Sequence, residues 1–293
     1  MKLKKIDLMT NTFEEIGTQN YDGVVHFKEK NVFYGYMNRT IYRNFEGVES
    51  NQKINTWSPG WYKTIEKSFN DKDLIVSINK NQIMIFFDVA SDVKKDLSDL
   101  PFQIIELSQE DKIRQFKSLS QNRLLVMTNK GKIYLYRYTQ SKHDLISQAS
   151  VDLDKEEDAI SLSVSSDERF IAFSSRDTDR AFSRLFNMKI GPENSLTDIN
   201  EYRSPFIIKR KDSCFSDLNF DMKLRGIPIL TAFQYSNLNI YLFAFYKEEF
   251  HLTKIIVPEC IGRICRSSVY KNKLMAMDSE SKLISLTFLS ADT

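Results

Sequence analysis

The chain has few of the residues on which catalytic and metal sites depend. Its 293 residues include three histidines, three cysteines and two tryptophans. A structural zinc site alone takes about four Cys, His or acidic ligands. The G-x-S-x-G, H-E-x-x-H, G-x-G-x-x-G and P-loop motifs are also absent from the sequence. The sequence therefore predicts a protein that is not an enzyme and that holds no cofactor and no metal ion.

Cysteine pairing, bulk charge and long apolar runs are lacking as well. Three cysteines (Cys214, Cys260, Cys265) are an odd number in a long chain, so they do not indicate a disulfide framework. The 41 basic and 39 acidic residues nearly cancel, which argues against binding to nucleic acid or membranes by bulk charge. No apolar run approaches the roughly 20 residues of a membrane-spanning helix. We expect a cytoplasmic or nuclear protein with no membrane partner and no evident small-molecule substrate.

One pattern recurs six times along the chain: an apolar strand, a short polar turn and a second apolar strand. These hairpins cover Val32–Arg43, Leu74–Phe87, Leu124–Arg137, Phe170–Met188, Ile229–Phe245 and Lys273–Phe288. Equivalent positions on the second strands are 42, 50, 52, 55 and 44 residues apart (Ile41, Ile83, Ile133, Leu185, Ile240, Ile284). A hairpin repeated at this period is typical of a β-propeller.

The prediction is an all-β fold in which residues 1–293 form a single β-propeller domain. A further apolar segment before each hairpin, and usually another after it, such as Arg203–Ile208 after the fourth, indicates six four-stranded blades, with seven blades as the alternative. The unassigned segment Leu3–Leu8 is predicted to pair with the last repeat and close the ring, because closure removes an open sheet edge. Helix is expected only as single turns, for example at Phe13–Ile16.

The fourth repeat resembles a WD40 repeat. Ser166–Phe170 occupies the position of the turn after the inner strand, and Phe186–Asn187 stands where the Trp-Asp dipeptide ends a WD40 repeat. Phe87–Asp88 ends the second hairpin similarly. The resemblance implies a WD40-like propeller. With so few histidines and tryptophans, the Asp-His-Ser/Thr-Trp network of that family is expected to be absent or replaced by aromatic packing.

The remaining polar candidates point to structure rather than chemistry. His26, His143 and His251 have no catalytic partners at a useful spacing, so each is expected to be a surface or structural histidine. The acidic run Asp152–Asp158 lies between two repeats and is typical of a solvated loop.

The least ordinary segment contains both tryptophans. Trp57 and Trp61 flank a Ser-Pro-Gly turn and are followed by Tyr62. These aromatic residues either pack over a blade edge or anchor a partner, since exposed Trp and Tyr dominate interface energetics. A basic patch of Lys209, Arg210 and Lys211, with Tyr202 and Phe206 nearby in the sequence, is a second candidate for partner contact.

These observations favour a non-enzymatic scaffold for protein–protein interaction, a structural or adaptor subunit of a larger intracellular complex. Other protein subunits are its expected partners. The alternative is an RNA-contacting accessory subunit of an RNA-processing or RNA-modifying complex, which depends on the basic and aromatic segments alone. A propeller-type hydrolase is the third and weakest hypothesis, because no carboxylate pair has a spacing that indicates acid–base catalysis.

Overall fold

The structure is a computed structural model that describes part of the chain. The backbone is described for residues 2–7, 12–20, 23–27, 32–37, 40–45, 52–53, 65–67, 75–79, 81–87, 102–177, 182–202, 215–224, 226–234, 239–256, 264–270, 273–278 and 283–287. Side chains are described for residues 81–87, 102–177, 183–202, 215, 218–220, 223–224, 226–234 and 239–256.

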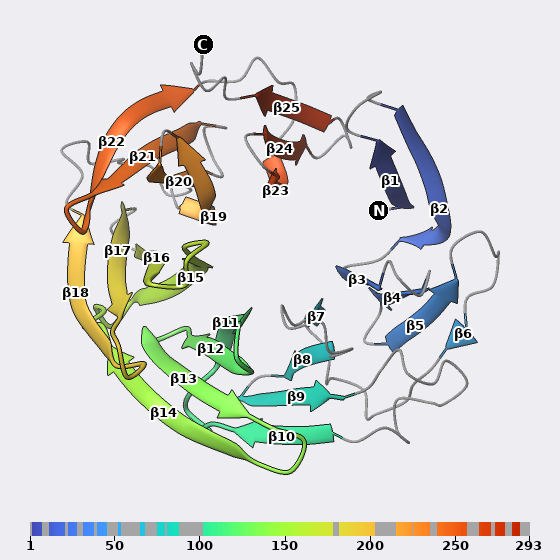
Figure 1. Cartoon of the computed structure of the whole chain (residues 1–293), viewed down its shortest axis with the longest axis horizontal. Helices are drawn as coiled ribbons and strands as arrows, with labels where there is room; N and C mark the ends of the chain where they lie inside the picture. The colour runs from blue at the N-terminus through green and yellow to red at the C-terminus, as the bar shows by residue number, and fades with distance from the viewer. Residues whose placement is uncertain are drawn as a thin grey trace. The chain divides into compact units, whose positions relative to one another are not determined.

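The chain divides into two compact units. The first comprises Met1–Ile113, Ser118–Leu124 and Arg137–Asp144. Its sheets are all antiparallel (Figure 1). One is the pair β1 (Lys2–Asp7) and β2 (Thr12–Asn20); the others are β3 (Gly23–Phe27), β4 (Val32–Met37), β5 (Thr40–Phe45) and β6 (Gln52–Lys53), then β7 (Ile65–Lys67), β8 (Ile75–Asn79), β9 (Gln82–Phe86) and β10 (Phe102–Glu106).

The second unit comprises Arg114–Lys117, Leu125–Tyr136 and Leu145–Thr293. One four-stranded sheet divides its residues between both units: β11 (Ile113–Leu119), β12 (Arg123–Thr128), β13 (Lys132–Tyr138) and β14 (His143–Ser150). The other sheets of the second unit are β15 (Glu157–Val164), β16 (Phe170–Asp177), β17 (Phe182–Ile190) and β18 (Leu196–Tyr202), then β19 (Phe215–Leu224), β20 (Ile227–Gln234), β21 (Ile240–Tyr246) and β22 (Glu249–Ile256), and the three strands β23 (Ile264–Tyr270), β24 (Lys273–Asp278) and β25 (Leu283–Thr287).

The six predicted hairpins are confirmed. Each forms the second and third strands of one sheet, from β4–β5 to β24–β25. Every described element is a strand, so the described residues contain no helix that could cross a membrane. Five of the six repeats appear as four-stranded sheets and the last has three described strands. The number of blades and the closure of a ring stay predictions.

Two sequence predictions about the N-terminus differ from the structure. The segment Leu3–Leu8 was expected to pair with the last repeat, but β1 pairs with β2, with Ile6 opposite Phe13. The expected helical turn at Phe13–Ile16 is wrong, because these residues lie inside β2. Pairing with the next strand along the chain has the smaller entropic cost, because a short loop loses less entropy on closing than a long one.

The outer strand of the fourth repeat is also displaced from its prediction. The outer strand is β18, at Leu196–Tyr202, which directly precedes the predicted segment. The predicted segment, Arg203–Ile208, lies outside the described residues. Strand β18 is mostly polar and exposed, because it is the last strand in the sheet order and has water on its outer side. A search for apolar runs therefore misses it.

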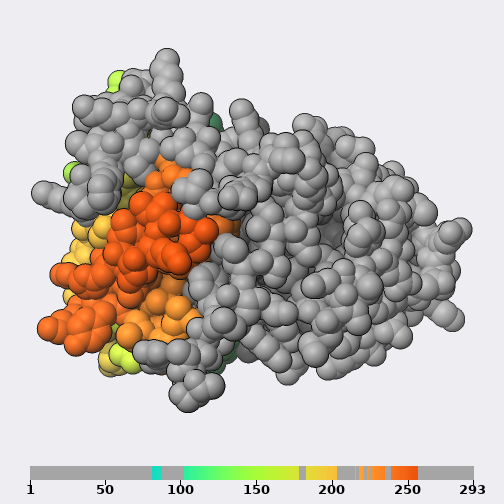
Figure 2. All heavy atoms as spheres, turned by 90° about the horizontal axis from the view of Figure 1, so that it is seen from above, coloured from blue at the N-terminus to red at the C-terminus, as the bar shows by residue number. Residues whose placement is uncertain are grey.

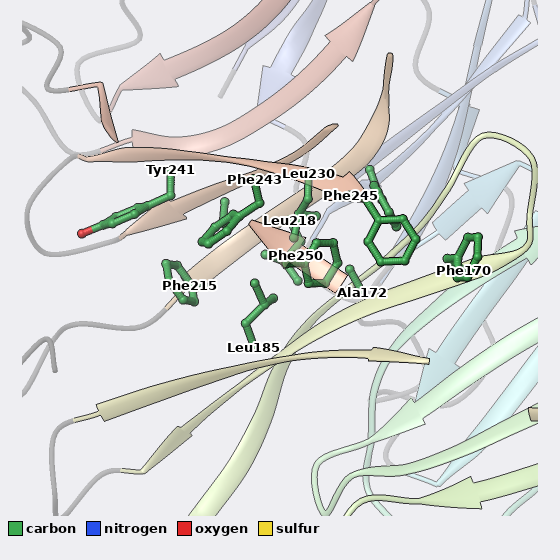
Figure 3. Close-up of a cluster of buried hydrophobic side chains, with 12 residues drawn as sticks. Phe170, Ala172, Leu185, Phe215, Leu218, Leu230, Tyr241, Phe243, Phe245 and Phe250 are labelled. Carbon is green, nitrogen blue, oxygen red and sulfur yellow. The ribbon is translucent and has the colours of Figure 1, made fainter. Parts of the chain in front are cut away.

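The core between the sheets β15–β18 and β19–β22 is aromatic (Figure 3). The ring centroids of Phe170 and Phe245 lie 4.6 Å apart, and Phe220 meets Phe245 edge to face at 5.3 Å. Such pairs add to the free energy gained from burial alone. The members of this cluster are Phe170, Ala172, Leu185, Phe215, Leu218, Phe220, Leu230, Ala232, Tyr241, Phe243, Phe245 and Phe250. The expected aromatic packing between repeats is thus present.

Candidate interaction surface

The residues that the sequence singled out for partner binding are not covered by the structure. Trp57, Trp61 and Tyr62 lie between β6 and β7, and Lys209, Arg210 and Lys211 lie between β18 and β19, all outside the described residues. Both interpretations of the tryptophans therefore stay predictions. The candidate surface described below comes from the second unit, where side chains are described.

The histidines occupy strands. His26 lies within β3, and His143 begins β14 with its side chain exposed. His251 is exposed on β22, where its Nε2 lies 3.3 Å from the carbonyl oxygen of Tyr246. Among the residues with described side chains, no group of three or more His, Cys, Asp or Glu residues is placed to hold a metal ion.

The acidic run Asp152–Asp158 contains a buried charge, which corrects the prediction of a simple solvated loop. Glu157 opens β15 and its side chain has no exposed surface, whereas Arg184 on β17 is 20% exposed. Arg184 donates through Nε to Glu157 Oε1 at 2.9 Å and makes a second, shorter contact through its terminal nitrogen. Ser175 on β16 donates its hydroxyl hydrogen to the same carboxylate. Three strands of one sheet therefore meet at this carboxylate.

The same network extends to the loop before β15 and to the outer strand. The backbone N–H of Asp154 donates to Glu157 Oε2 at 3.1 Å, and Arg184 donates to the carbonyl oxygen of Asp152 at 3.0 Å. Arg184 also reaches Glu201 on β18 at 3.5 Å. We call Glu157, Ser175, Arg184 and Glu201 the charged brace. Charge-assisted bonds of this kind hold strand ends in fixed positions.

The pKa shifts of Glu157 and Arg184 both favour the charged forms of these side chains. Burial raises the pKa of Glu157, but the hydrogen bonds from Arg184, Ser175 and the Asp154 N–H outweigh burial and leave the pKa below its ordinary value of 4.5. The hydrogen bond with Glu157 raises the pKa of Arg184. Because both partners keep their charges inside the sheet, the brace is a structural ion pair.

Serine hydroxyls join the inner strands of neighbouring sheets. Strands β15 and β19 lie side by side. Ser161 and Ser163 on β15 accept hydrogen bonds from the backbone N–H groups of Leu218 and Phe220, at 3.2 and 3.0 Å. Ser174 on β16 donates to the carbonyl oxygen of Phe215 at 2.7 Å. These bonds satisfy backbone groups that β19 would otherwise leave buried without partners on that side.

The turn between β15 and β16, which resembles a WD40 turn in sequence, is held by hydrogen bonds of its own side chains. Asp167 accepts from the Ser165 hydroxyl at 2.6 Å and from the Arg169 N–H at 3.3 Å, and Ser165 Oγ accepts from the Phe170 N–H at 3.0 Å. Glu168 adopts a left-handed φ of 55° within it. Burial raises the pKa of Asp167, but the Ser165 and Arg169 hydrogen bonds, with the charges of Lys223 and Arg169, lower it overall. The turn is thus built by its own side chains.

The most exposed large apolar side chain in the described part belongs to Tyr246, the last residue of β21. It is 57% exposed, and Lys247 Nζ lies 5.5 Å from the centroid of its ring. Ile227, at the start of β20, is 41% exposed. The β20–β21 register pairs Ile229 with Ala244, so Ile227 and Tyr246 lie at the same end of the two strands. Figure 2 shows β21 and β22, coloured orange, on the surface beside β18 in yellow.

The sequence analysis did not identify Tyr246, because the residues on the same side of its strand are buried or half-buried. Leu242 is buried and Ala244 half-buried on the same side of the strand, and the pattern places Tyr246 with them. It is exposed because the strand ends there, at the two-residue turn Lys247–Glu248. The signal that could have found it is the Lys-Glu-Glu sequence that interrupts the apolar run.

Three solved structures resemble this fold. A protein from Lactobacillus plantarum has a TM-score of 0.62 and 14% identity, with 97% of this chain and 90% of that one covered. Raptor from Chaetomium thermophilum has a TM-score of 0.68 and 10% identity, with 93% of this chain and 24% of Raptor covered. YCF48 bound to the D1 peptide has a TM-score of 0.58 and 10% identity, with 95% and 85% covered.

These neighbours are propeller-type proteins and support the predicted WD40-like propeller fold. At 10–14% identity the likeness shows the fold alone. The chain matches no protein-family model and no curated protein.

Proposed function

We propose that this protein is a non-enzymatic scaffold for protein–protein interaction, a structural or adaptor subunit of a larger intracellular complex. The observation that carries the proposal is the likeness to propeller-type structures, one of which holds a bound peptide. Propellers of this kind host many functions, so the argument for binding must come from the surface.

The charged groups of the second unit support a structural rather than a catalytic role. Among the residues whose side chains are described, the one fully buried carboxylate with a lowered pKa is that of Glu157, which is bound by Arg184 and closed to solvent. The carboxylate of Asp167, whose pKa is also lowered, accepts its hydrogen bonds from residues of its own turn. A catalytic acid or base needs access to substrate, which Glu157 lacks.

The predicted anchors remain the two tryptophans and Tyr62, with Lys209, Arg210 and Lys211 as a lesser polar patch. Aromatic side chains bury much area at small entropic cost, which is why they dominate binding energy in interfaces. Tyr246 is a further candidate from the described surface.

The proposal is tested by purifying the tagged protein from its own cells and identifying what copurifies. A defined set of proteins in fixed ratio is expected, and it should persist after ribonuclease treatment and in high salt. Loss of the set on ribonuclease treatment would favour the RNA-contacting alternative, because phosphate contacts carry most nucleic-acid affinity. Recovery of the protein alone would contradict the scaffold role.

The matched control for that experiment is Leu145→Ala, which removes an apolar side chain that is 48% exposed on β14. This variant should keep the full set of partners, whereas Trp57→Ala and Trp61→Ala should lose at least one. Equal recovery from all three variants would remove the tryptophans from the interface but leave the scaffold role intact.

A further inference from the structure

The turn between β21 and β22 has a backbone conformation that its own residues do not favour. Tyr246 pairs directly with Glu249, so Lys247 and Glu248 form a two-residue turn. Their φ angles are 51° and 63°, both left-handed. Turns of this type normally contain Asn or Gly, because a Cβ atom destabilises the left-handed region. Contacts from outside the turn must therefore help to hold it.

Those contacts come from β17 of the neighbouring sheet. Asn187 donates through Nδ2 to the carbonyl oxygen of Glu248 at 3.1 Å. Lys189 Nζ lies 2.6 Å from Glu248 Oε1. Asn187 is buried, with 4% of its surface exposed, so the donor side of this bond lies inside the protein. Glu248 is thus held by β17 through both its backbone carbonyl and its side chain.

Asn187 also contacts the outer strand of its own sheet. It lies opposite Asn200 of β18, and its Oδ1 accepts from Asn200 Nδ2 at 3.4 Å. The β17–β18 pairing is irregular immediately beyond this pair, between Asn187 and Lys189, and Asp198 there has a left-handed φ of 54°. Strand β18 is the last in its sheet order and most of its side chains are exposed. A buried amide thus joins an irregular edge strand to a strained turn.

We propose that Asn187 couples β18 to the β21–β22 turn, so that a change at Asn200, the β18 residue bonded to Asn187, loosens the turn that follows Tyr246. The structure shows the left-handed arrangement of the turn in contact with β17, and loss of the Asn187 hydrogen bond is expected to loosen it. The coupling is a property of the folded chain and does not depend on the scaffold role.

The test is residue-resolved amide hydrogen exchange of Tyr246 and Glu249, which pair with each other across the turn. Asn187→Asp keeps the size of the side chain but removes the donor to Glu248, and should speed exchange of these amides about five- to tenfold, the scale of one lost hydrogen bond. Asn200→Ala should speed the same amides about two- to fivefold although it lies on another strand. Thr197→Ala, also exposed on β18 but not bonded to Asn187, is the matched control and should leave them unchanged.

Each outcome decides the matter. Faster exchange in Asn200→Ala with slow exchange in Thr197→Ala supports the coupling. Unchanged exchange in Asn200→Ala shows that the effect stops at Asn187 and overturns it. If Asn187→Asp does not fold, the comparison of Asn200→Ala with Thr197→Ala decides the outcome alone.

Discussion

Removal of Arg184 tests how far the charged brace stabilises the fold. Arg184→Ala leaves the carboxylate of Glu157 buried with only two neutral donors, the Ser175 hydroxyl and the Asp154 N–H. Breaking one side of a buried ion pair typically costs about 3–5 kcal/mol. Because Arg184 is 20% exposed and water can enter its place, we expect about 3 kcal/mol. That is a large part of the roughly 5–15 kcal/mol by which a domain is stable.

The measurement is urea unfolding followed by circular dichroism. Arg184→Met removes the guanidinium group, whose carbon lies 5.0 Å from the centroid of the Phe186 ring, but keeps a long apolar side chain, so it should cost somewhat less than Arg184→Ala. The double variant Glu157→Leu/Arg184→Met removes both charges and should recover most of the loss, because no unpaired charge then remains buried. A free energy of unfolding for Arg184→Ala within about 0.5 kcal/mol of the unmodified protein, the range of ordinary surface substitutions, would refute the reasoning.

Four further measurements follow: one addresses the charged brace again, two address the core and the serine bonds, and one addresses partner binding. Since the folded pKa of Glu157 lies below 4.5, its contribution is present above pH 4.5 and is lost as the pH falls through the folded pKa; Glu157→Gln should therefore flatten the acid limb of a stability–pH curve. Ser163→Ala leaves a buried N–H of β19 unpaired and should cost about 1–3 kcal/mol in urea unfolding. Phe243→Ala opens a cavity in the aromatic core and should cost about 3–5 kcal/mol by the same assay, with unchanged stability contradicting the packing. Trp57→Ala should weaken partner binding by about 2 kcal/mol in a pull-down titration without lowering the melting temperature, if the residue is an anchor. If Trp57 instead packs over a blade edge, the melting temperature falls and binding per folded molecule is unchanged.

The hairpins could be predicted from sequence because strand alternation is a local signal. In β13, buried Ile133 and Leu135 alternate with half-buried Lys132 and Tyr134, as the period of two requires. The turns follow from local chemistry as well: Ser165 and Asp167 build theirs from side chains within six residues.

The charged brace could not be predicted, because its partners are distant in the sequence. Glu157 stands in a run of acidic residues that reads as a solvated loop, and Arg184 lies 27 residues away. Only the pairing of β15 with β16 and of β16 with β17 brings Ser175 and Arg184 to that carboxylate. The partner predicted for Leu3–Leu8 was wrong for a related reason. Alternation of apolar and polar residues predicts that a segment is a strand, but not which other strand it pairs with.

The irregular pairing of the outer strands has a consequence for behaviour at high concentration. Strand β18 is interrupted opposite Asn187 and Lys189, and β22 is interrupted opposite Leu242 and Phe243. A regular outer strand would present a continuous row of N–H and C=O groups that a second molecule could extend into a shared sheet. Because the irregularities interrupt this row on both strands, a second copy could form strand-to-strand hydrogen bonds along either edge over only a few residues. Self-association through these strands is therefore disfavoured in a crowded cell.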